Sequence, residues 1–417
     1  MNIILDASPL GIGFYHRKAQ TGVSRVAEEL LKGLWQASDI DLSLAASTHL
    51  PETMRYVRQA FNGSMPPFVN TAGGRLSARL ENALLGPFEA GSLPSKAIRQ
   101  VAYRTRKAFN REQGRFRVTQ FPEGAIYHSP FFSIPKSVRQ IPTVQTIHDL
   151  IPILHPEWFP AGEQTVRQVI EALPPTAWVT TVSQATKDDF CQYTGFDPAR
   201  VVPIHLAASP TLFHPVADEV QKQAIRQQYG IGETPYLLSL ATFEPRKNTD
   251  HLIRCFVKLA KSGEIPADVK LVLVGTKGWK FDRIVDELSR HDTLRSRLVV
   301  TGFVPDEHLA PLYAGALGFV YPSLYEGFGL PPLEAMQCGL PVIVSDIPAS
   351  AEVVGDAAIR VPPTDVNALC QAMLTLIQSS SLRANLSAKA IARASQFSWA
   401  KFIQRHIELY KTIAEQA

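Results

Sequence analysis

Short apolar segments that favour β-strands alternate with helical patterns along almost the whole chain of 417 residues. In the first half, the strand candidates are residues 2–7, 125–128, 143–147 and 178–182. In the second half, they are residues 236–241, 270–275, 298–301, 318–321 and 342–345. Buried parallel strands connected by helical crossovers produce this pattern. The sequence therefore predicts an α/β fold of two doubly wound, Rossmann-like domains.

The length of the chain also favours two domains, because it exceeds the size of a usual single core. The stretch 209–235 is the best place to divide it, since Phe213-His214-Pro215 is followed there by a polar helical run. We expect an N-terminal domain at 1–215 and a C-terminal domain at 216–395. Apolar residues at helical spacing predict a last amphipathic helix within 396–417.

Composition excludes several classes of protein. A hydrophobic content of 45% and a charged content of 19% are typical of a soluble globular protein. The net charge of +4 is too small for a dedicated nucleic-acid binder. With no apolar run of about twenty residues and no secretory leader, we expect a cytoplasmic protein. The four cysteines lie far apart, which argues against a disulfide framework or a zinc site.

Two glutamates, Glu326 and Glu334, flank a Gly-Phe-Gly-Leu-Pro-Pro turn. Because the two prolines suit a first helical turn, we expect Glu326 in the preceding loop and Glu334 near the helix start. Gly327 and Gly329 let the backbone approach a ligand, and the free N–H groups of the helix start favour a phosphate. Carboxylates for hydroxyl groups beside an anion site would suit a nucleotide sugar. Taken alone, each glutamate is more often an ordinary residue: Glu334 would be a first-turn glutamate that favours the helix dipole, and the glycines would only shape a turn.

Arg246 and Lys247 follow the strand candidate at 236–241 and precede a helical pattern that begins near Thr249. A guanidinium and an ammonium group there can neutralise a diphosphate, most of all when a sugar bond breaks and negative charge collects on the leaving group. An isolated Arg-Lys pair is more often a solvated surface feature. The residues by themselves leave both interpretations open.

His148 stands at the C-terminal end of the strand candidate at 143–147, where open α/β sheets place their reactive groups. The following Asp149 could orient the imidazole by accepting from a ring nitrogen. Near the start of the chain, Gly22 lies in a glycine turn that leads into a helical pattern, which is a weak anion-binding signal. On the residues alone, both features are more often structural than functional.

Taken together, these strings resemble the retaining glycosyltransferases of family 4. The resemblance rests on Glu-Gly-Phe-Gly-Leu-Pro at 326–331, Gly-Leu-Pro-Val-Ile at 339–343, Pro-Arg-Lys-Asn at 245–248, Thr-x-His-Asp at 146–149 and Thr-Gly-x-x-Arg at 21–25. It covers nearly the whole chain and is weakest over 50–120. Many members carry an arginine six positions before the lysine, where this chain has Ala241. Lys247 is therefore the firmer match, and Arg246 is the residue that would compensate.

The resemblance implies the GT-B architecture, in which two Rossmann-like domains face one another and a C-terminal helix crosses back to the first. It assigns the donor-sugar hydroxyls to Glu326, the ribose hydroxyls to Glu334 and a contact with the donor to His148. Further donor contacts would come from Gly22, Phe303 and Val304 and from the backbone of Gly327, Phe328, Gly329 and Leu330. Because Lys247 and Arg246 would neutralise the charge of the diphosphate, neither a metal nor another cofactor is implied.

The implied reaction moves a hexose from a nucleoside-diphosphate sugar to a hydroxyl of a glycan or a lipid-linked oligosaccharide, with retention of configuration. The strings look most like bacterial mannosyltransferases of surface polysaccharides, which makes GDP-mannose the first choice of donor and leaves UDP-glucose and deoxysugars open. Two alternatives are a nucleotide-sugar epimerase of the same fold and a non-catalytic scaffold. An epimerase needs a further acid and base, which we do not find, and a scaffold could lose Lys247, His148 or Glu326.

A basic segment covers residues 93–120, where eight Lys and Arg face one Glu. Several apolar residues recur in it at helical spacing. Anionic lipid headgroups or a lipid-diphosphate acceptor would suit this combination, so peripheral contact with the inner face of the cell membrane is one interpretation. A solvated basic helix is the other, because the apolar stripe is thin.

Overall fold

The computed structural model describes residues 1–15, 22–61, 65–88, 92–109, 121–159, 163–276, 278 and 292–416. These residues form two six-stranded sheets, one in each half of the chain. The first sheet contains β1 (Asn2–Asp6), β2 (Asp41–Ala45), β3 (Ile126–Ser129), β4 (Thr143–Ile147), β5 (Trp178–Thr181) and β6 (Val201–Pro203). The second contains β7 (Tyr236–Leu240), β8 (Lys270–Val274), β9 (Leu298–Gly302), β10 (Gly318–Tyr321), β11 (Val342–Ser345) and β12 (Ile359–Val361).

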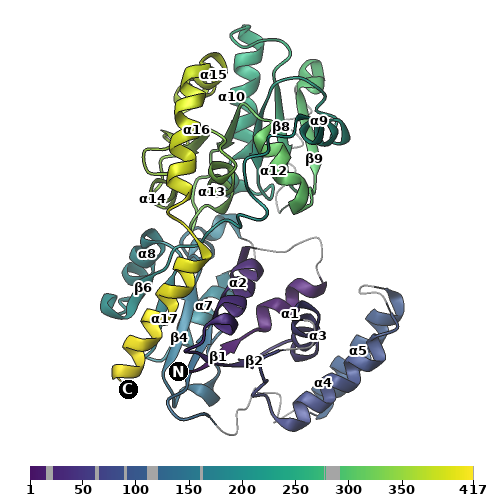
Figure 1. Cartoon of the computed structure of the whole chain (residues 1–417), viewed down its shortest axis with the longest axis vertical. Helices are drawn as coiled ribbons and strands as arrows, with labels where there is room; N and C mark the ends of the chain where they lie inside the picture. Colours follow the sequence, from purple (N-terminus) through teal and green to yellow (C-terminus); the bar gives the residue numbers. More distant parts are fainter. Residues whose placement is uncertain are drawn as a thin grey trace.

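The order of the strands makes both sheets doubly wound, and Figure 1 shows the two halves one above the other. The first sheet has the order β2-β1-β3-β4-β5-β6, and the second has β12-β11-β10-β7-β8-β9. Neighbouring strands pair in parallel in both. The winding reverses between β1 and β3 in the first sheet and between β7 and β10 in the second. Open α/β sheets bind their ligands at such switch points, beyond the C-terminal ends of the strands.

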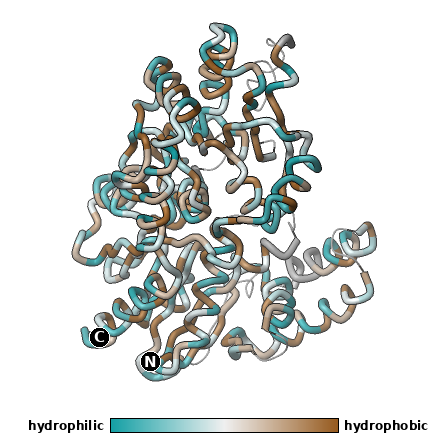
Figure 2. The backbone as a smooth tube through the Cα atoms, turned by 45° about the horizontal axis from the view of Figure 1, so that its top comes forward, coloured by the Kyte–Doolittle hydropathy of each residue, from teal (hydrophilic) through white to brown (hydrophobic). Residues whose placement is uncertain are grey.

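Helices flank both sheets. In the first half they are α1 (Ser8–Tyr15), α2 (Gly22–Gln36), α3 (Leu50–Ala60), α4 (Ala72–Leu85), α5 (Leu93–Phe109), α6 (Ile151–Leu154), α7 (Glu163–Glu171) and α8 (Gln184–Thr194). In the second half they are α9 (Glu219–Gln228), α10 (Thr249–Ser262), α12 (Asp306–Ala314), α13 (Leu330–Gln337), α14 (Pro348–Val354), α15 (Val366–Gln378) and α16 (Ser380–Ala394). In Figure 2, hydrophobic and hydrophilic residues alternate along many of these helices.

Burial on both faces explains why the strands read as apolar runs. Ile3 and Leu5 of β1 enter one hydrophobic core, and Ile4 between them enters another on the opposite face. Leu237 and Leu238 of β7 are divided between two cores in the same way. A strand covered by helices on both sides has apolar residues on both of its faces, unlike a strand with one face in water.

The last helix, α17 (Trp399–Gln416), leaves the second half and lies along the first (Figure 1). It approaches α2 so closely that a Cβ atom at Gly33 would lie 2.2 Å from Ile403 Cγ1. Its Tyr410 hydroxyl lies 2.6 Å from Nδ1 of the buried His128 in β3. This crossing completes the arrangement that the sequence predicts, so the fold class is confirmed.

The sequence does not predict three of the edge strands, β2, β6 and β12. They are short or partly exposed, so they lack a long apolar run. The strands that were expected all form, and their ends differ from the predicted ones by at most one residue. The division at 215/216 stays a prediction; β6 ends at Pro203 and α9 begins at Glu219.

Candidate active site

The loop after β7 carries Lys247 to the switch point of the second sheet. Pro245–Lys247 forms a single 3-10 turn, after which Asn248 has a left-handed φ of 56°. Asn adopts this conformation more readily than most residues. Its side-chain amide donates to the carbonyl oxygens of Pro322 at 3.1 Å and Pro363 at 2.9 Å. The loop is thereby tied to the segment that follows β10, and Lys247 is buried.

Glu326 meets both basic side chains because β10, which precedes it, pairs with β7. Its Oε1 accepts from Lys247 Nζ at 2.5 Å and from the Tyr321 hydroxyl at 2.8 Å. Its Oε2 accepts from Arg246 Nη1 at 2.8 Å. Lys247 Nζ also donates to the Tyr321 hydroxyl at 2.6 Å. The structure therefore joins three of the predicted catalytic residues in one buried cluster.

The charges of this cluster determine the protonation of Glu326. Burial by itself favours the neutral carboxyl, but attraction by Arg246 and Lys247 outweighs it and lowers the pKa of Glu326 to about 2. Burial and the neighbouring guanidinium lower the pKa of Lys247, against the pull of Glu326. Arg246 also forms an ion pair with the buried Glu244. Glu326 is thus a carboxylate at neutral pH and cannot serve there as a proton donor.

Glu334 lies on α13, which begins after Gly329 at a φ of 110°. Its Oε1 accepts from Nη1 of Arg25, on α2 of the first half, at 2.8 Å. Nη2 of the same arginine donates to Asp306 at 2.6 Å. Burial raises the pKa of Glu334 to about 7, and the attraction of Arg25 offsets only part of that effect. An arginine therefore contacts the carboxylate to which the family resemblance gives the ribose.

Gly327 touches the first half of the chain directly. A Cβ atom at this position would lie 2.2 Å from the carbonyl oxygen of His148 and 3.0 Å from Asp149 Cβ. Ser183 Oγ and Thr186 Oγ1, at the start of α8, donate to the Gly327 carbonyl at 2.5 and 3.0 Å. The glycine of the Glu-Gly-Phe-Gly string is thus required by the contact between the two halves.

The imidazole of His148 is oriented by a backbone carbonyl. Its Nε2 lies 2.8 Å from the oxygen of Pro130, and because a carbonyl only accepts, Nε2 carries the proton and Nδ1 keeps a lone pair. Burial lowers the pKa of His148, which keeps the ring neutral at pH 7. Asp149 Oδ1 accepts from the Ile151 amide at 3.0 Å, and that this carboxylate also orients the ring stays a prediction.

The other predicted donor contacts lie on both sides of the boundary between the halves. Gly22 is the first residue of α2, and a Cβ atom there would lie 3.6 Å from Leu330 Cδ1 at the start of α13. Phe303 is 47% exposed, whereas Val304 is buried. Phe328 is also buried, with its ring near other aromatic side chains. A ligand at this loop would therefore meet the backbone of Phe328 and not its ring.

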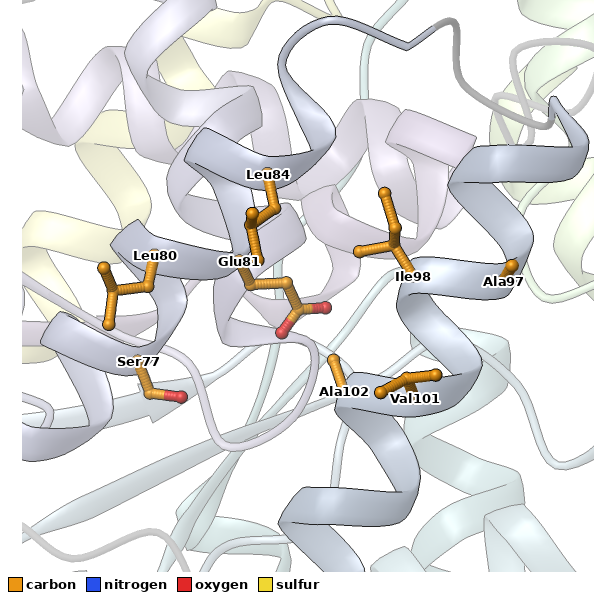
Figure 3. Close-up of a pocket in the computed structure, with 8 residues that line it drawn as sticks. All are labelled: Ser77, Leu80, Glu81, Leu84, Ala97, Ile98, Val101 and Ala102. Atoms are coloured by element: carbon orange, nitrogen blue, oxygen red, sulfur yellow. The ribbon is translucent and has the colours of Figure 1, made fainter.

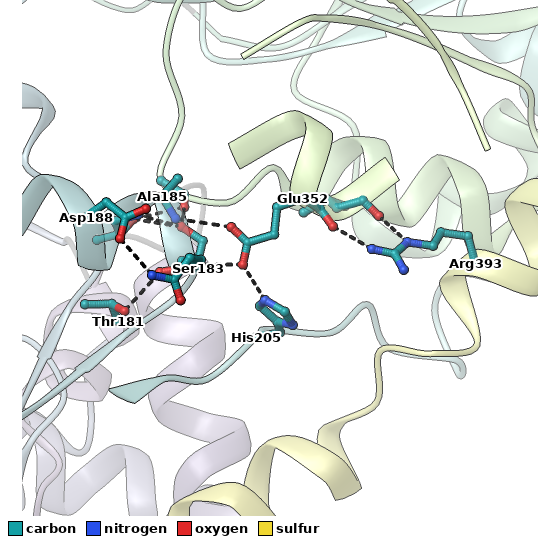
Figure 4. A network of polar contacts seen from close by, with 11 residues as sticks. Thr181, Ser183, Ala185, Asp188, His205, Glu352 and Arg393 are labelled. Carbon is teal, nitrogen blue, oxygen red and sulfur yellow. Dashed lines mark hydrogen bonds and ion pairs between the residues drawn. The ribbon is translucent and has the colours of Figure 1, made fainter. Parts of the chain in front are cut away.

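A second polar connection between the halves is centred on Glu352 of α14 (Figure 4). Its carboxylate accepts from the backbone amides of Gln184 at 2.7 Å and Ala185 at 3.2 Å, at the start of α8. Nε2 of His205 lies 2.5 Å from the same carboxylate, and Arg393 donates to the Glu352 carbonyl at 2.6 Å. An anion at a helix N-terminus is favourable, so Glu352 stabilises α8 from the opposite half.

Sequence reasoning missed several of these partners. Glu352, Ser183 and Thr186 belong to no motif, and only their position in space reveals what they do. Two others carried a usable signal: Arg25 closes the Thr-Gly-x-x-Arg string, and Tyr321 is the last residue of a predicted strand. Within the described ranges, no group of three or more His, Cys, Asp or Glu is placed to hold a metal ion.

Known proteins give the class to which this fold and site belong. Residues 221–393 match the family of glycosyl transferases group 1. O-antigen chain mannosyltransferase B of Escherichia coli is 34% identical over 290 residues, which cover 69% of this chain and 74% of that protein. The chain belongs to the group 1 glycosyltransferases. The predicted family is thus confirmed, and the protein is a transferase.

Further similarities agree with this assignment. The serotype-specific mannosyltransferase WbdA of Escherichia coli is 30% identical over 72% of this chain, which spans only 37% of that longer protein. Among solved structures, Anabaena HepE in complex with UDP has a TM-score of 0.65 at 19% identity, over 99% of both chains. WaaG, a glycosyltransferase involved in lipopolysaccharide biosynthesis, has a TM-score of 0.62 at 14% identity, over 98% of this chain and 99% of its own. At these identities the two structures establish the shared fold alone.

Proposed function

We propose that the protein transfers mannose from GDP-mannose to a hydroxyl of a glycan or a lipid-linked oligosaccharide, with retention of configuration, during synthesis of a bacterial surface polysaccharide. The choice of sugar rests on the names of the relatives, which are O-antigen mannosyltransferases. The observation that carries the proposal is the buried cluster of Lys247, Arg246 and Glu326 at the switch point of the second sheet.

Lys247 and Arg246 are the candidates to stabilise the leaving group. When the bond between the sugar and the diphosphate breaks, negative charge grows on the diphosphate, and two fixed cations lower the energy of that state. They would supply charge that a metal ion supplies in other transferases. Both cations contact Glu326 in the structure, so the same carboxylate holds the two of them in place.

Glu326 and His148 are the candidates to bind hydroxyls of the donor sugar. With a pKa of about 2, Glu326 accepts hydrogen bonds and donates none at neutral pH. The Nδ1 lone pair of His148 is a second acceptor, and Gly327 connects the two residues through its contact with the His148 carbonyl. Neither residue therefore acts as a proton donor at pH 7 in our proposal. Retention would come from assistance by the donor phosphate, as the family resemblance implies.

Glu334 is the candidate for the ribose, and Arg25 is its present partner. A ribose would have to share this carboxylate with Arg25 or replace it, and Asp306 would keep the arginine nearby in either case. Gly22, Phe303, Val304, Phe328, Gly329 and Leu330 complete the proposed donor site. We further propose the domain division at 215/216 and 395/396, with the acceptor on the first domain, and a cytoplasmic location.

The test is a panel of nucleotide sugars, with thermal shift and release of nucleoside diphosphate measured for each, with and without an extract of bacterial lipid-linked oligosaccharides. GDP-mannose should stabilise the wild type, release GDP only with the acceptor and produce an α-linked mannose, as judged by NMR. Lys247→Gln should bind more weakly and lose turnover, whereas Lys261→Gln, on the exposed face of α10, should behave as the wild type.

Each other outcome contradicts a specific part of the proposal. Turnover with a different donor would overturn the choice of GDP-mannose, and a β-linked product would overturn retention. Conversion of the donor into another sugar nucleotide without acceptor would indicate an epimerase. Donor binding with no turnover on any acceptor fraction would indicate a scaffold.

A further inference from the structure

Helices α4 and α5 form a hairpin, residues 72–109, which extends away from the first sheet. Figure 1 shows it at the edge of the lower half, beyond α3 and β2. Helix α4 packs against α3 on one side and against α5 on the other. None of the predicted donor contacts lies in this hairpin, so the proposed active site does not explain it.

One face of the hairpin is apolar and exposed. Leu76, Leu80 and Leu84 recur every four residues on α4, which places them on one side of the helix, and they are 59%, 60% and 63% exposed. On α5, Leu93 is 83% exposed and Val101 is 62% exposed. Scattered apolar residues on a surface need no explanation, but an aligned set of large ones marks a surface for binding.

An apolar groove lies between the two helices (Figure 3). It has a volume of about 470 Å³, and Leu80, Leu84, Ile98, Val101 and Ala102 contribute to its walls. Glu81 also borders the groove but is only 5% exposed, so its carboxylate is not presented to solvent. A groove with such apolar walls suits a hydrocarbon group.

The charge of the hairpin is opposite to that of an anionic membrane. Residues 72–109 contain seven Lys and Arg and two Glu, a net charge of +5, whereas the whole chain carries +4. All the other residues together therefore carry −1. Arg79 on α4 and Lys96 on α5 are exposed beside the apolar face. The remainder of the basic segment, 110–120, lies outside the described residues.

We propose that the hairpin docks on the surface of a bilayer that contains anionic phospholipids, with the leucines among the acyl chains and the basic side chains at the headgroups. Apolar burial combined with attraction to anionic lipid is what holds interfacial helices on membranes. No helix of the described residues is long and apolar enough to cross a membrane. The contact would therefore be peripheral, and it would bring the enzyme to a lipid-linked acceptor, a purpose that rests on the proposed function.

Two other occupants fit the surface less well. A second copy of the chain, packed hairpin to hairpin, would bring together two segments that each carry a net charge of +5 in their sequence. A nucleic acid would match the charge but would leave the row of leucines in water. An anionic bilayer satisfies both the charge and the apolar face.

The test measures binding to vesicles of phosphatidylcholine, with and without phosphatidylglycerol, by co-sedimentation of the full chain. The wild type should bind the anionic vesicles, and added salt should weaken that binding. Leu80→Glu and Leu84→Glu should each weaken it by about tenfold or more, because each replaces a leucine that the bilayer would bury with a charged side chain. Arg79→Gln and Lys96→Gln should each weaken it by about fivefold.

Matched controls lie on the other half of the molecule. Val220→Glu, at a position 76% exposed on α9, and Lys261→Gln on α10 should bind vesicles as the wild type does. All variants should keep the wild-type circular dichroism spectrum, and turnover with a water-soluble acceptor should be unchanged by Leu80→Glu. This last readout separates failure of the membrane proposal from failure of the proposed function.

Three results would overturn the proposal: no binding of the wild type to anionic vesicles, equal loss of binding in the control variants, or equal binding with and without phosphatidylglycerol. Sedimentation velocity provides a fourth. A wild-type dimer that Leu80→Glu dissociates would assign the face to self-association.

Discussion

Glu326→Gln tests whether the charges around the proposed site have the strength that the structure indicates. Glutamine has the shape of a protonated glutamate, so the variant reports the free energy that ionised Glu326 contributes to folding. The pKa of Glu326 falls from an ordinary value of 4.5 to about 2 in the folded protein. At about 1.4 kcal/mol per pKa unit, the ionised carboxylate stabilises the fold by about 3 kcal/mol. Removal of one partner from a buried ion pair typically costs about 3–5 kcal/mol, which agrees.

The pH dependence of this effect has a definite sign. A carboxyl whose pKa is lowered by folding stabilises the protein above its unfolded pKa, and the contribution disappears as the pH falls through the folded value. The difference in unfolding free energy between wild type and Glu326→Gln should be about 3 kcal/mol at pH 7. It should shrink as the pH falls from 4.5 towards 2.

The assay is urea unfolding at fixed pH, followed by circular dichroism and by tryptophan fluorescence. Glu408→Gln is the matched control, because Glu408 pairs with Arg405 at 3.0 Å while both side chains are largely exposed. It should cost less than about 1 kcal/mol. A loss below about 1 kcal/mol for Glu326→Gln at pH 7, or a difference that grows as the pH falls, would refute the reasoning. The same variant should also lose sugar transfer, whereas Glu408→Gln should keep it.

Two further predictions follow from the same contacts. Gly327→Ala should lower transfer by about a hundredfold, because its Cβ atom would lie 2.2 Å from the His148 carbonyl oxygen and displace the loop. Gly73→Ala is the control and should leave transfer unchanged, because a Cβ atom at Gly73 would meet no neighbouring atom within 4 Å. Normal activity of Gly327→Ala would contradict the close contact. For Glu334, folding raises the pKa from 4.5 to about 7, so its stabilising contribution is present below pH 4.5 and is lost as the pH rises to 7. As the pH rises from 4.5 to 8, the free energy of unfolding of Glu334→Gln should therefore increase by about 3 kcal/mol relative to that of the wild type. A thermal-unfolding series with the opposite trend would mean that attraction by Arg25 outweighs burial in setting the pKa of Glu334.

The interface between the two halves has a consequence for these experiments. Residues of the donor site contact both halves, through Arg25 to Glu334 and through Ser183 to Gly327. Glu352 adds a third connection, at the start of α8. Variants at these positions are expected to change how the halves sit together as well as how they bind a donor. Small-angle scattering of each variant distinguishes the two effects.

Much of the fold can be predicted from the sequence because strands buried on both faces appear in it as short apolar segments. Strands in the middle of a sheet are rich in apolar residues on both faces, and those strands are predicted to within one residue. The edge strands β2, β6 and β12 do not stand out as apolar segments, since few of their residues have to be apolar. Their pairing depends on contacts with β1, β5 and β11, which are distant in the sequence or beyond a helix.

For the site, the sequence by itself determined which chemical groups stand at the ends of strands and where glycine is needed. It placed Lys247 after β7 and Glu326 after β10, but only the strand order decided that these two strands are neighbours. Only the tertiary structure brought Arg25 to Glu334, 309 residues away. The two glutamates of the motif show the physical reason. Identical side chains eight residues apart have pKa values of about 2 and about 7, because burial and the charges supplied by distant segments set the energy of each carboxylate.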